Sequence, residues 1–296
     1  MLRAEGRRGV LRLLAALLRR LWLDLALALL IAALSVPLGP ALSRRLTPDL
    51  VLPLLGIAAS VLIGFRFSQA YARWWEARTL WGQLRNAGRA WKTALLALAV
   101  EPLQPLLERQ VLLVWSLVAE LRPSAPDPPG LAWQLEQLRQ RFPGEVGSQV
   151  LLDAQARAVA VAYGDGQLEP TGRGVLSERL RDTGNAIGGL ERIRAQPFPA
   201  AMALFSRLVV WLFAWLMFLR LEAAPITPTA GNAVAFALMA GYITADRLAA
   251  YLDQPLGDPL LGLPQHHIAA AISRDLLGPS HPLAQPPQPA SATVWT

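Results

Sequence analysis

Long apolar runs alternate with arginine-rich polar segments along the chain, and they predict helices that span a membrane. The first two spans are expected at about Leu21–Leu38 and Leu50–Tyr71, and the last at about Ile226–Ala245, which is twenty residues without a charge. The sixteen uncharged residues from Leu50 to Phe65 would cover roughly 24 Å as a helix, less than the ~30 Å of a hydrocarbon layer. The second span is therefore expected to continue through Arg66 toward Tyr71.

A third span must include a charged residue. Only twelve residues, Leu208–Leu219, separate Arg207 from Arg220. This span needs Phe198–Phe205 to reach across the bilayer, and Arg207 then lies within it. Since an arginine in lipid is costly, we expect Arg207 to face protein or water.

The polar middle of the chain reads as mostly helical and water-facing. Apolar residues recur there at helical spacing, and no strand alternation of any length is present. They are Val111, Val114, Trp115, Val118 and Leu121, then Leu176, Leu180 and Ile187. The pattern predicts an all-α membrane protein with four transmembrane helices and a helical cytosolic portion.

The expected domains follow from these patterns. The chain divides into a basic cytosolic N-terminus (1–20), a first transmembrane hairpin (21–75), a helical cytosolic region (76–197), a second transmembrane hairpin (198–250), a cytosolic turn with a short helix (251–278) and a disordered Pro-rich tail (279–296). The tail is mainly Pro, Gln, Ala and Ser, a composition that buries too little surface to become ordered.

Arginine and tryptophan mark the cytoplasmic side. Six arginines precede the first span, and a basic, tryptophan-rich run follows the second. Lys and Arg accumulate in cytoplasmic loops, while tryptophan rings favour the headgroup region. We therefore expect both termini in the cytoplasm. The residues expected to anchor and orient the second span at the interface are Arg66, Arg73, Trp74, Trp75 and Arg78, with Trp81 also at headgroup level.

Composition excludes several classes of protein. With 53% hydrophobic residues, an integral membrane protein fits better than a soluble domain. The absence of cysteine excludes disulfides, thiolate metal sites and cysteine nucleophiles. The net charge is +7, and the basic residues cluster beside apolar spans. This placement favours membrane lipids over nucleic acid as partners. No catalytic motif or cofactor fingerprint is present, so we expect no enzyme and no cofactor. Asp258 is only a weak metal candidate.

An apolar ladder runs along one face of the second span. At about 100° per residue, Ile57, Val61 and Phe65 fall within roughly 80° of one another, and Arg66 and Arg73 point the other way. Two interpretations are open. Several copies of the helix can surround an axis, so that the ladder forms a hydrophobic constriction that gates by dewetting. Alternatively, the ladder is ordinary helix packing.

Three blocks of residues resemble the bacterial branch of the bestrophin family and span nearly the whole chain outside its two tails. They are Gly64-Phe65-Arg66, Tyr71, Arg73-Trp74-Trp75-Glu76-Ala77-Arg78 and Leu80-Trp81-Gly82; Ile187-Gly188-Gly189 and Glu191-Arg192-Ile193 with Pro197-Phe198-Pro199; and Asp253, Pro255, Gly257 and Leu263-Pro264.

The resemblance implies a homopentamer around a central pore, with passive flow of small anions, chiefly chloride. It implies a bacterial inner (plasma) membrane location. It also implies a pore neck at Ile57, Val61 and Phe65, which favours the pore interpretation of the ladder. A second, cytosolic constriction in the family corresponds to Phe198 in the Pro-Phe-Pro elbow.

The chain departs from the family at two places. The bacterial pattern usually has asparagine after Gly-Phe-Arg, whereas this chain has Phe67-Ser68. The acidic cluster that holds calcium in animal members is reduced here to Asp258, so calcium gating of that kind is not expected.

Two further functions remain as alternatives to an anion channel. Some bacterial relatives conduct cations, so a sodium-conducting channel is one. A membrane scaffold that conducts nothing is the other, with the tryptophan-arginine run serving only to anchor the protein and bind lipid.

Overall fold

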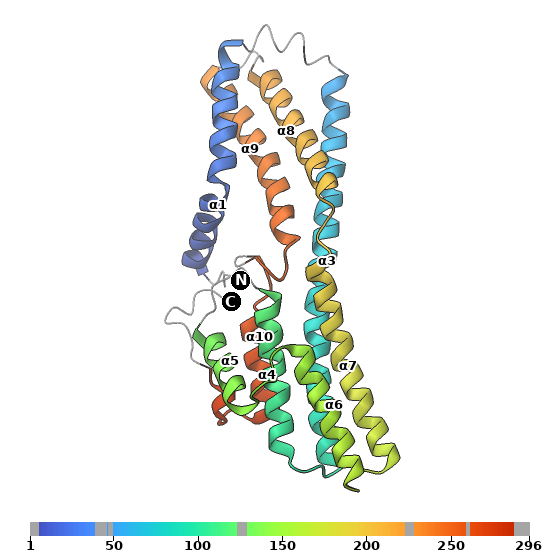
Figure 1. The fold of residues 1–296 in the computed structure, drawn as a ribbon. Helices are drawn as coiled ribbons and strands as arrows, with labels where there is room; N and C mark the ends of the chain where they lie inside the picture. The colour runs from blue at the N-terminus through green and yellow to red at the C-terminus, as the bar shows by residue number, and fades with distance from the viewer. Residues whose placement is uncertain are drawn as a thin grey trace. The chain divides into compact units, whose positions relative to one another are not determined.

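The computed structural model consists of helices joined by turns and loops, with no strand, in the part of the chain that it describes, which is residues 6–38, 46, 50–122, 129–222, 228–258 and 261–286 (Figure 1). Its α-helices are α1 (Gly6–Ser35), α3 (Val51–Ala97), α4 (Leu103–Leu121), α5 (Pro129–Arg141), α6 (Ser148–Gly164), α7 (Pro170–Ala195), α8 (Ala200–Glu222), α9 (Pro228–Leu252) and α10 (Gln265–Leu277). Two short 3₁₀ helices, η1 (Val36–Leu38) and η2 (Pro282–Ala284), complete the described elements.

The chain forms two compact units. The apolar unit comprises the described residues of Ala4–Arg73 and Pro197–Gln254, and the core unit comprises Trp74–Gln196 and the described residues from Pro255 on. Helix α3 has 47 residues without interruption, about 70 Å at 1.5 Å per residue. Its first half belongs to the apolar unit and its second half to the core unit.

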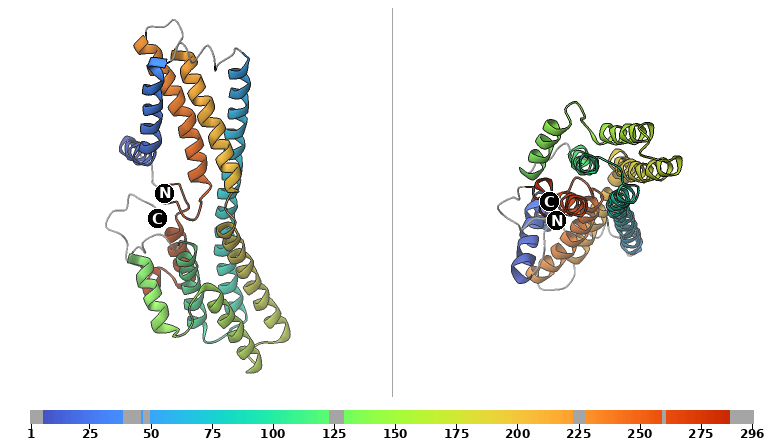
Figure 2. Two further views of the ribbon diagram at one scale, coloured as in Figure 1. Left: turned by 45° about the horizontal axis from the view of Figure 1, so that its top comes forward. Right: turned by 90° about the horizontal axis from the view of Figure 1, so that it is seen from below.

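In the apolar unit, α8 and α9 pack along each other and α1 packs mainly on α9 (Figures 1 and 2). Small side chains let these helices approach closely, which is the usual basis of helix packing in membranes. Buried Ala28 and Ala32 of α1 lie with Ala214, Ala235 and Phe218, which are also buried.

Three described helices are long and apolar enough to cross a membrane: Val51–Ala97, Ala200–Leu221 and Gly231–Leu252. They correspond to the second, third and fourth expected spans. Helix α1 is also long, and its apolar part begins at Leu21, immediately after Arg19 and Arg20. The turn between the first two spans lies largely outside the described residues.

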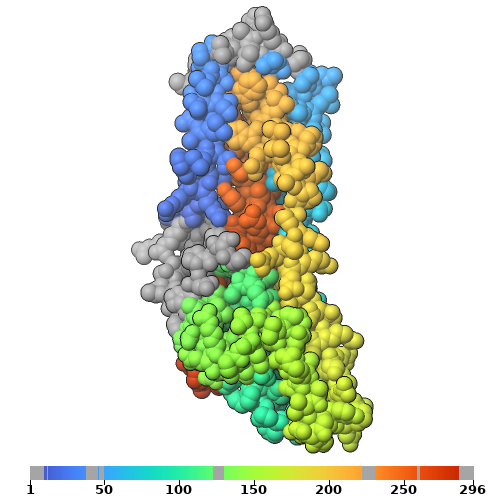
Figure 3. All heavy atoms as spheres, in the orientation of Figure 1, coloured from blue at the N-terminus to red at the C-terminus, as the bar shows by residue number. Residues whose placement is uncertain are grey.

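The core unit surrounds α4. Helices α5, α6, α7 and α10 all contact α4, and in the space-filling view α5 and α6 cover part of it (Figure 3). The predicted apolar positions of α4 and α7 are all buried, among them Trp115 and Leu176. Helical spacing in the sequence therefore located the core correctly.

Two sequence-based expectations differ from the fold. Trp81, expected at the lipid headgroups, has 0% exposure and belongs to the core around α4. The tail, expected to be disordered from residue 279, forms η2 at Pro282–Ala284 with Leu283 fully buried. Gln134 donates a hydrogen bond of 2.7 Å to the Leu283 carbonyl. One leucine in a proline-rich segment is enough to dock it, whereas residues 287–296 lie outside the described part.

Candidate ion pathway

The first half of α3 has two different faces. Ala59 is fully buried against Val210 and Phe213 of α8. A Cβ on Gly56 would lie 3.0 Å from the Phe213 ring, so glycine allows this close contact. The packed face of α3 is therefore the one that carries Gly56 and Ala59.

The ladder lies on the exposed part of α3. Ile57 and Val61 are each 64% exposed and Phe65 is 48% exposed. Ordinary packing within one subunit therefore does not explain these three residues in the described chain. Whether they form a pore neck depends on what covers them in an assembly.

Arg66 follows the ladder but turns to the packed side. It is 7% exposed and forms an ion pair and hydrogen bond with Asp246 of α9, which is 1% exposed. The sequence predicts a headgroup anchor at this position, whereas the structure gives Arg66 a buried partner from another helix. Tertiary pairing outweighs snorkelling here because a buried carboxylate without a counter-charge is strongly unfavourable.

Arg207 also faces Asp246. Its Nε lies 3.5 Å from Asp246 Oδ2, and its side chain is 34% exposed. The expectation that an arginine within the third span faces protein or water is therefore confirmed. A single carboxylate of α9 lies between guanidinium groups from α3 and α8.

The other predicted anchors have varied surroundings. Arg73 Nε lies 3.8 Å from Asp253 Oδ1 in the apolar unit. In the core unit, Trp74 donates a hydrogen bond of 3.1 Å to the Leu261 carbonyl. Trp75 is 56% exposed and Arg78 is exposed. Of these residues, Trp75 and Arg78 have exposed side chains.

Phe198 lies in the non-helical elbow between Pro197 and Pro199, directly before α8. Its backbone N–H donates a hydrogen bond to the Asp253 carboxylate. Burial raises the pKa of Asp253 above its ordinary value, although Arg73, the Phe198 backbone and Arg66 act in the opposite direction. The elbow is thus held by its two prolines and by a carboxylate at the end of α9.

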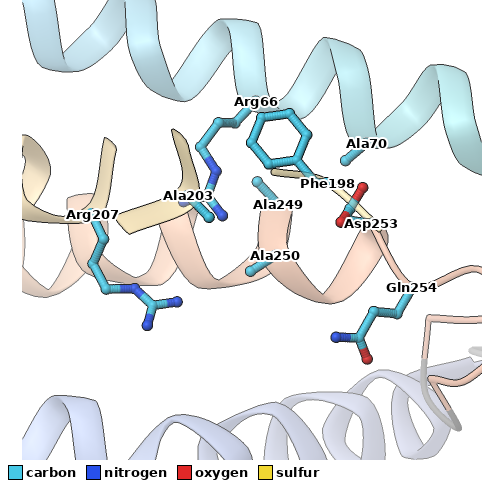
Figure 4. A pocket seen from close by; sticks show the side chains of 9 residues that line it. All are labelled: Arg66, Ala70, Phe198, Ala203, Arg207, Ala249, Ala250, Asp253 and Gln254. Atoms are coloured by element: carbon cyan, nitrogen blue, oxygen red, sulfur yellow. The ribbon is translucent and has the colours of Figure 1, made fainter. Parts of the chain in front are cut away.

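A pocket of about 150 Å³ adjoins Phe198 within the apolar unit. Figure 4 shows Arg66 and Arg207 entering it from α3 and α8, with Ala249, Ala250, Asp253 and Gln254 contributed by α9 and the segment after it. Ala70 and Ala203 complete the lining. Sequence reasoning missed Asp246 and Gln254. The only available signal for Asp246 was an acid at the end of an apolar span.

No metal centre is formed by the described residues. They contain no group of three His, Cys, Asp or Glu side chains that could hold an ion. Asp258, the weak candidate, is 6% exposed, and its Oδ1 accepts a hydrogen bond of 2.8 Å from the Leu261 N–H. The Asp258 carboxylate therefore stabilises the turn after α9.

Comparisons with known proteins identify the family. The profile of the family described as bacterial/fungal bestrophin protein matches residues 8–277. The voltage-dependent anion channel-forming protein YneE of Escherichia coli K12 is 31% identical and covers 73% of this chain and 71% of its own length. The voltage-dependent anion channel-forming protein RSc3414 of Ralstonia nicotianae is 29% identical and covers 73% of each chain.

A solved structure agrees with this assignment. The crystal structure of a bacterial bestrophin homologue from Klebsiella pneumoniae has a TM-score of 0.74 and 25% sequence identity, and the match covers 88% of this chain and all of the other. The family profile, the sequence relatives and the structural neighbour lead to one conclusion: this chain belongs to the bacterial and fungal bestrophin family.

Proposed function

We propose that this chain forms a homopentameric channel for the passive flow of small anions, chloride among them. The observation that carries the proposal is the exposed apolar ladder on α3, a helix whose other face is packed. Five copies around one axis would bring their ladders together around a lumen. Ile57, Val61 and Phe65 of each copy would then line the neck of the pore. Family membership supports this arrangement.

The neck would gate by dewetting. A narrow ring of apolar side chains excludes water, so a hydrated ion that enters it loses its hydration shell without compensation. A small widening admits water and removes most of that barrier. Because the side chains are neutral, the ladder controls how much ion flow occurs but not which sign of ion is favoured.

The preference for anions has its support elsewhere. The relatives from Escherichia coli and Ralstonia nicotianae are named as anion channel-forming proteins. The net charge of +7 per chain raises the local concentration of anions near basic vestibules. A sodium-conducting channel is the competing proposal, and its discriminating property is the sign of the reversal potential.

We place the second constriction at Phe198. A ring held between two prolines cannot retreat far, because proline fixes φ on both sides of the elbow. The hydrogen bond from the Phe198 backbone to Asp253 restrains the same segment. The protein would lie in the bacterial inner membrane with both termini in the cytoplasm, as the arginines before the first span favour.

Replacing the ladder tests the neck. Ile57→Ala, Val61→Ala and Phe65→Ala combined should raise chloride flux through purified protein in liposomes by about tenfold or more, because a wider and less apolar ring stays wet. The matched control is Leu204→Ala, Phe205→Ala and Leu208→Ala on α8. These three residues are 58%, 56% and 60% exposed, so a similar area is removed from another face.

Liposome flux and the reversal potential together separate the alternatives. Equal flux from the two triple variants and the unmodified protein would remove the ladder as the gate. No flux from the unmodified protein would favour a scaffold. A reversal potential that follows the sodium gradient, measured in planar bilayers under a salt gradient, would favour the cation channel.

A further inference from the structure

The pocket beside Phe198 combines two guanidinium groups with small neighbours. Arg66 and Arg207 line it together with Ala70, Ala203, Ala249 and Ala250 (Figure 4). All of these residues belong to the apolar unit. The alanines leave a volume of about 150 Å³ open next to the charges.

The charges in and beside this pocket do not cancel. Arg66, Arg73 and Arg207 carry three positive charges, while Asp246 and Asp253 carry two negative charges. Asp253 pairs with Arg73, and the shortest contact of Asp246 is with Arg66. Arg207 is therefore the guanidinium with the least compensation, at 3.5 Å from a carboxylate that Arg66 already occupies.

Hydrogen bonding leads to the same residue. Neither Arg207 Nε nor Asp246 Oδ2 has a hydrogen-bond partner among the described residues, although both atoms are buried. A buried donor on a charged group is costly to leave without an acceptor. Arg207 Nε therefore has room for an additional acceptor, whereas Asp246 Oδ2 lacks a donor, which a water can supply.

A cation fits this pocket poorly. Asp253, the carboxylate in the lining, pairs with Arg73, and Asp246 beside the pocket has guanidinium groups against both of its oxygens. A cation that approached it would first meet Arg66 and Arg207. At short range, the three guanidinium groups of Arg66, Arg73 and Arg207 outweigh the carboxylates of Asp246 and Asp253, so the pocket electrostatically favours anions.

We propose that this pocket is a binding site for a small monovalent anion, with Arg207 as its direct contact. The proposal rests on the proposed channel function and assigns selectivity to a particular residue. Since a water occupies about 30 Å³ in the liquid, the pocket holds a halide with a few waters. Phe198 lines the pocket, so an anion bound there would lie beside the proposed second constriction.

Asp246 is a positioning residue in this site. It holds Arg66 on one oxygen and draws Arg207 toward the other. It also lowers the net charge of the five groups Arg66, Arg73, Arg207, Asp246 and Asp253 from +2 to +1. Conduction requires an ion to bind well enough to enter and weakly enough to leave. Asp246→Asn should therefore tighten anion binding and slow conduction.

Bromide is the probe for binding. Crystals of the detergent-purified protein grown in bromide should show an anomalous peak within about 4 Å of the Arg207 guanidinium, the usual outer limit for an ion pair. Arg207→Gln and the cavity-filling Ala203→Leu should both abolish the peak. Arg207→Lys should retain it. Retention by lysine keeps the test valid if Arg207→Gln folds poorly.

Permeability is the second readout. In planar bilayers, Arg207→Gln should lower the chloride-to-sodium permeability ratio by about tenfold, equivalent to roughly 1.4 kcal/mol. The matched control is Arg139→Gln on α5, an arginine that is 73% exposed and paired only with Glu136 in the described chain. This control should leave the ratio unchanged.

The two readouts separate the two proposals. Channels that conduct chloride but show neither a bromide peak nor a changed ratio in Arg207→Gln would overturn this site and leave the channel intact. A bromide peak in a protein that conducts nothing would overturn the channel. A lipid phosphate seated on Arg207, identified by phosphorus in the delipidated sample and by continuous acyl density, would overturn the halide assignment.

Discussion

Two adjacent glycines of α7 have opposite surroundings. A Cβ on Gly189 would lie 2.6 and 2.9 Å from the two methyl carbons of Leu80 and 3.3 Å from its Cγ. A Cβ on Gly188 would meet nothing within 4 Å. Alanine substitutions at these two positions therefore separate the effect of a side chain on packing from its effect on helix propensity.

Gly188→Ala should stabilise the protein by up to about 1 kcal/mol, because alanine is the better helix former. Gly189→Ala should destabilise it, with a difference of about 2 kcal/mol between the two variants, because the partly buried Leu80 side chain must leave its place against α7. Thermal unfolding of the two purified variants in one detergent measures the difference. Equal midpoints would contradict the close approach of α7 to α3.

At the scale of elements, one carboxylate connects α10 to the second half of α3. Arg85 Nε donates to Asp275 Oδ2 at 2.7 Å, and Arg89 Nε donates to the same oxygen at 2.9 Å. Lys92 adds a hydrogen bond of 3.1 Å to the Asp275 carbonyl. Three basic residues on successive turns of α3 thus converge on a single residue.

The pKa of Asp275 determines how this connection depends on pH. Burial alone would raise the pKa, but the hydrogen bonds and charges of Arg85 and Arg89 outweigh it and hold the pKa below its usual range. The unfolded chain therefore binds this proton more readily than the folded chain. The stabilisation is complete above the unfolded pKa of about 3.9 and is lost as the pH falls through the folded pKa.

Asp275→Asn should lower the stability at pH 7 by about 1 kcal/mol, a modest value because the site is partly solvated. It should also flatten the loss of stability of the core unit below about pH 4. The control is Asp153→Asn on α6, where the carboxylate accepts a hydrogen bond from Gln149 one turn away. Unfolding midpoints at pH 7 and pH 3.5 compare the three proteins, and identical pH profiles would exclude this role for Asp275.

The sequence predicted elements better than it predicted their partners. Helical spacing predicted one buried side of α4, where Val111, Val114, Trp115 and Val118 repeat, but every residue of 111–118 is buried. The partner of Arg66 was not predicted, because Asp246 is 180 positions away and nothing local marks the pairing. Trp81 was misplaced for a related reason. An indole suits a headgroup region and a protein core equally well, and only the neighbours decide.

For the whole molecule, the proposed assembly would set the total charge. Five chains at +7 each would give +35, a field that would concentrate anions but would be screened beyond about 10 Å at 0.1 M salt. A closed ring of five identical subunits repeats one head-to-tail interface, in which two different surfaces of the chain meet. The ladders of all five proposed subunits would face one shared lumen only if the ring closes.

The proposed assembly has a defined mass. Five copies of 32.1 kDa give about 160 kDa of protein, which light scattering with separate correction for detergent can measure. Native mass spectrometry gives the copy number directly. A particle of one or two chains that still conducts would contradict a neck built from five α3 helices.

The apolar ladder also bears on how such a protein is made. Ile57, Val61 and Phe65 have no polar atoms in their side chains, so a newly inserted subunit can rest in acyl chains without penalty before it meets its copies. In the proposed ring, a single subunit would therefore be stable in the bilayer without conducting ions, and ion flow would begin only when the fifth subunit closes the ring.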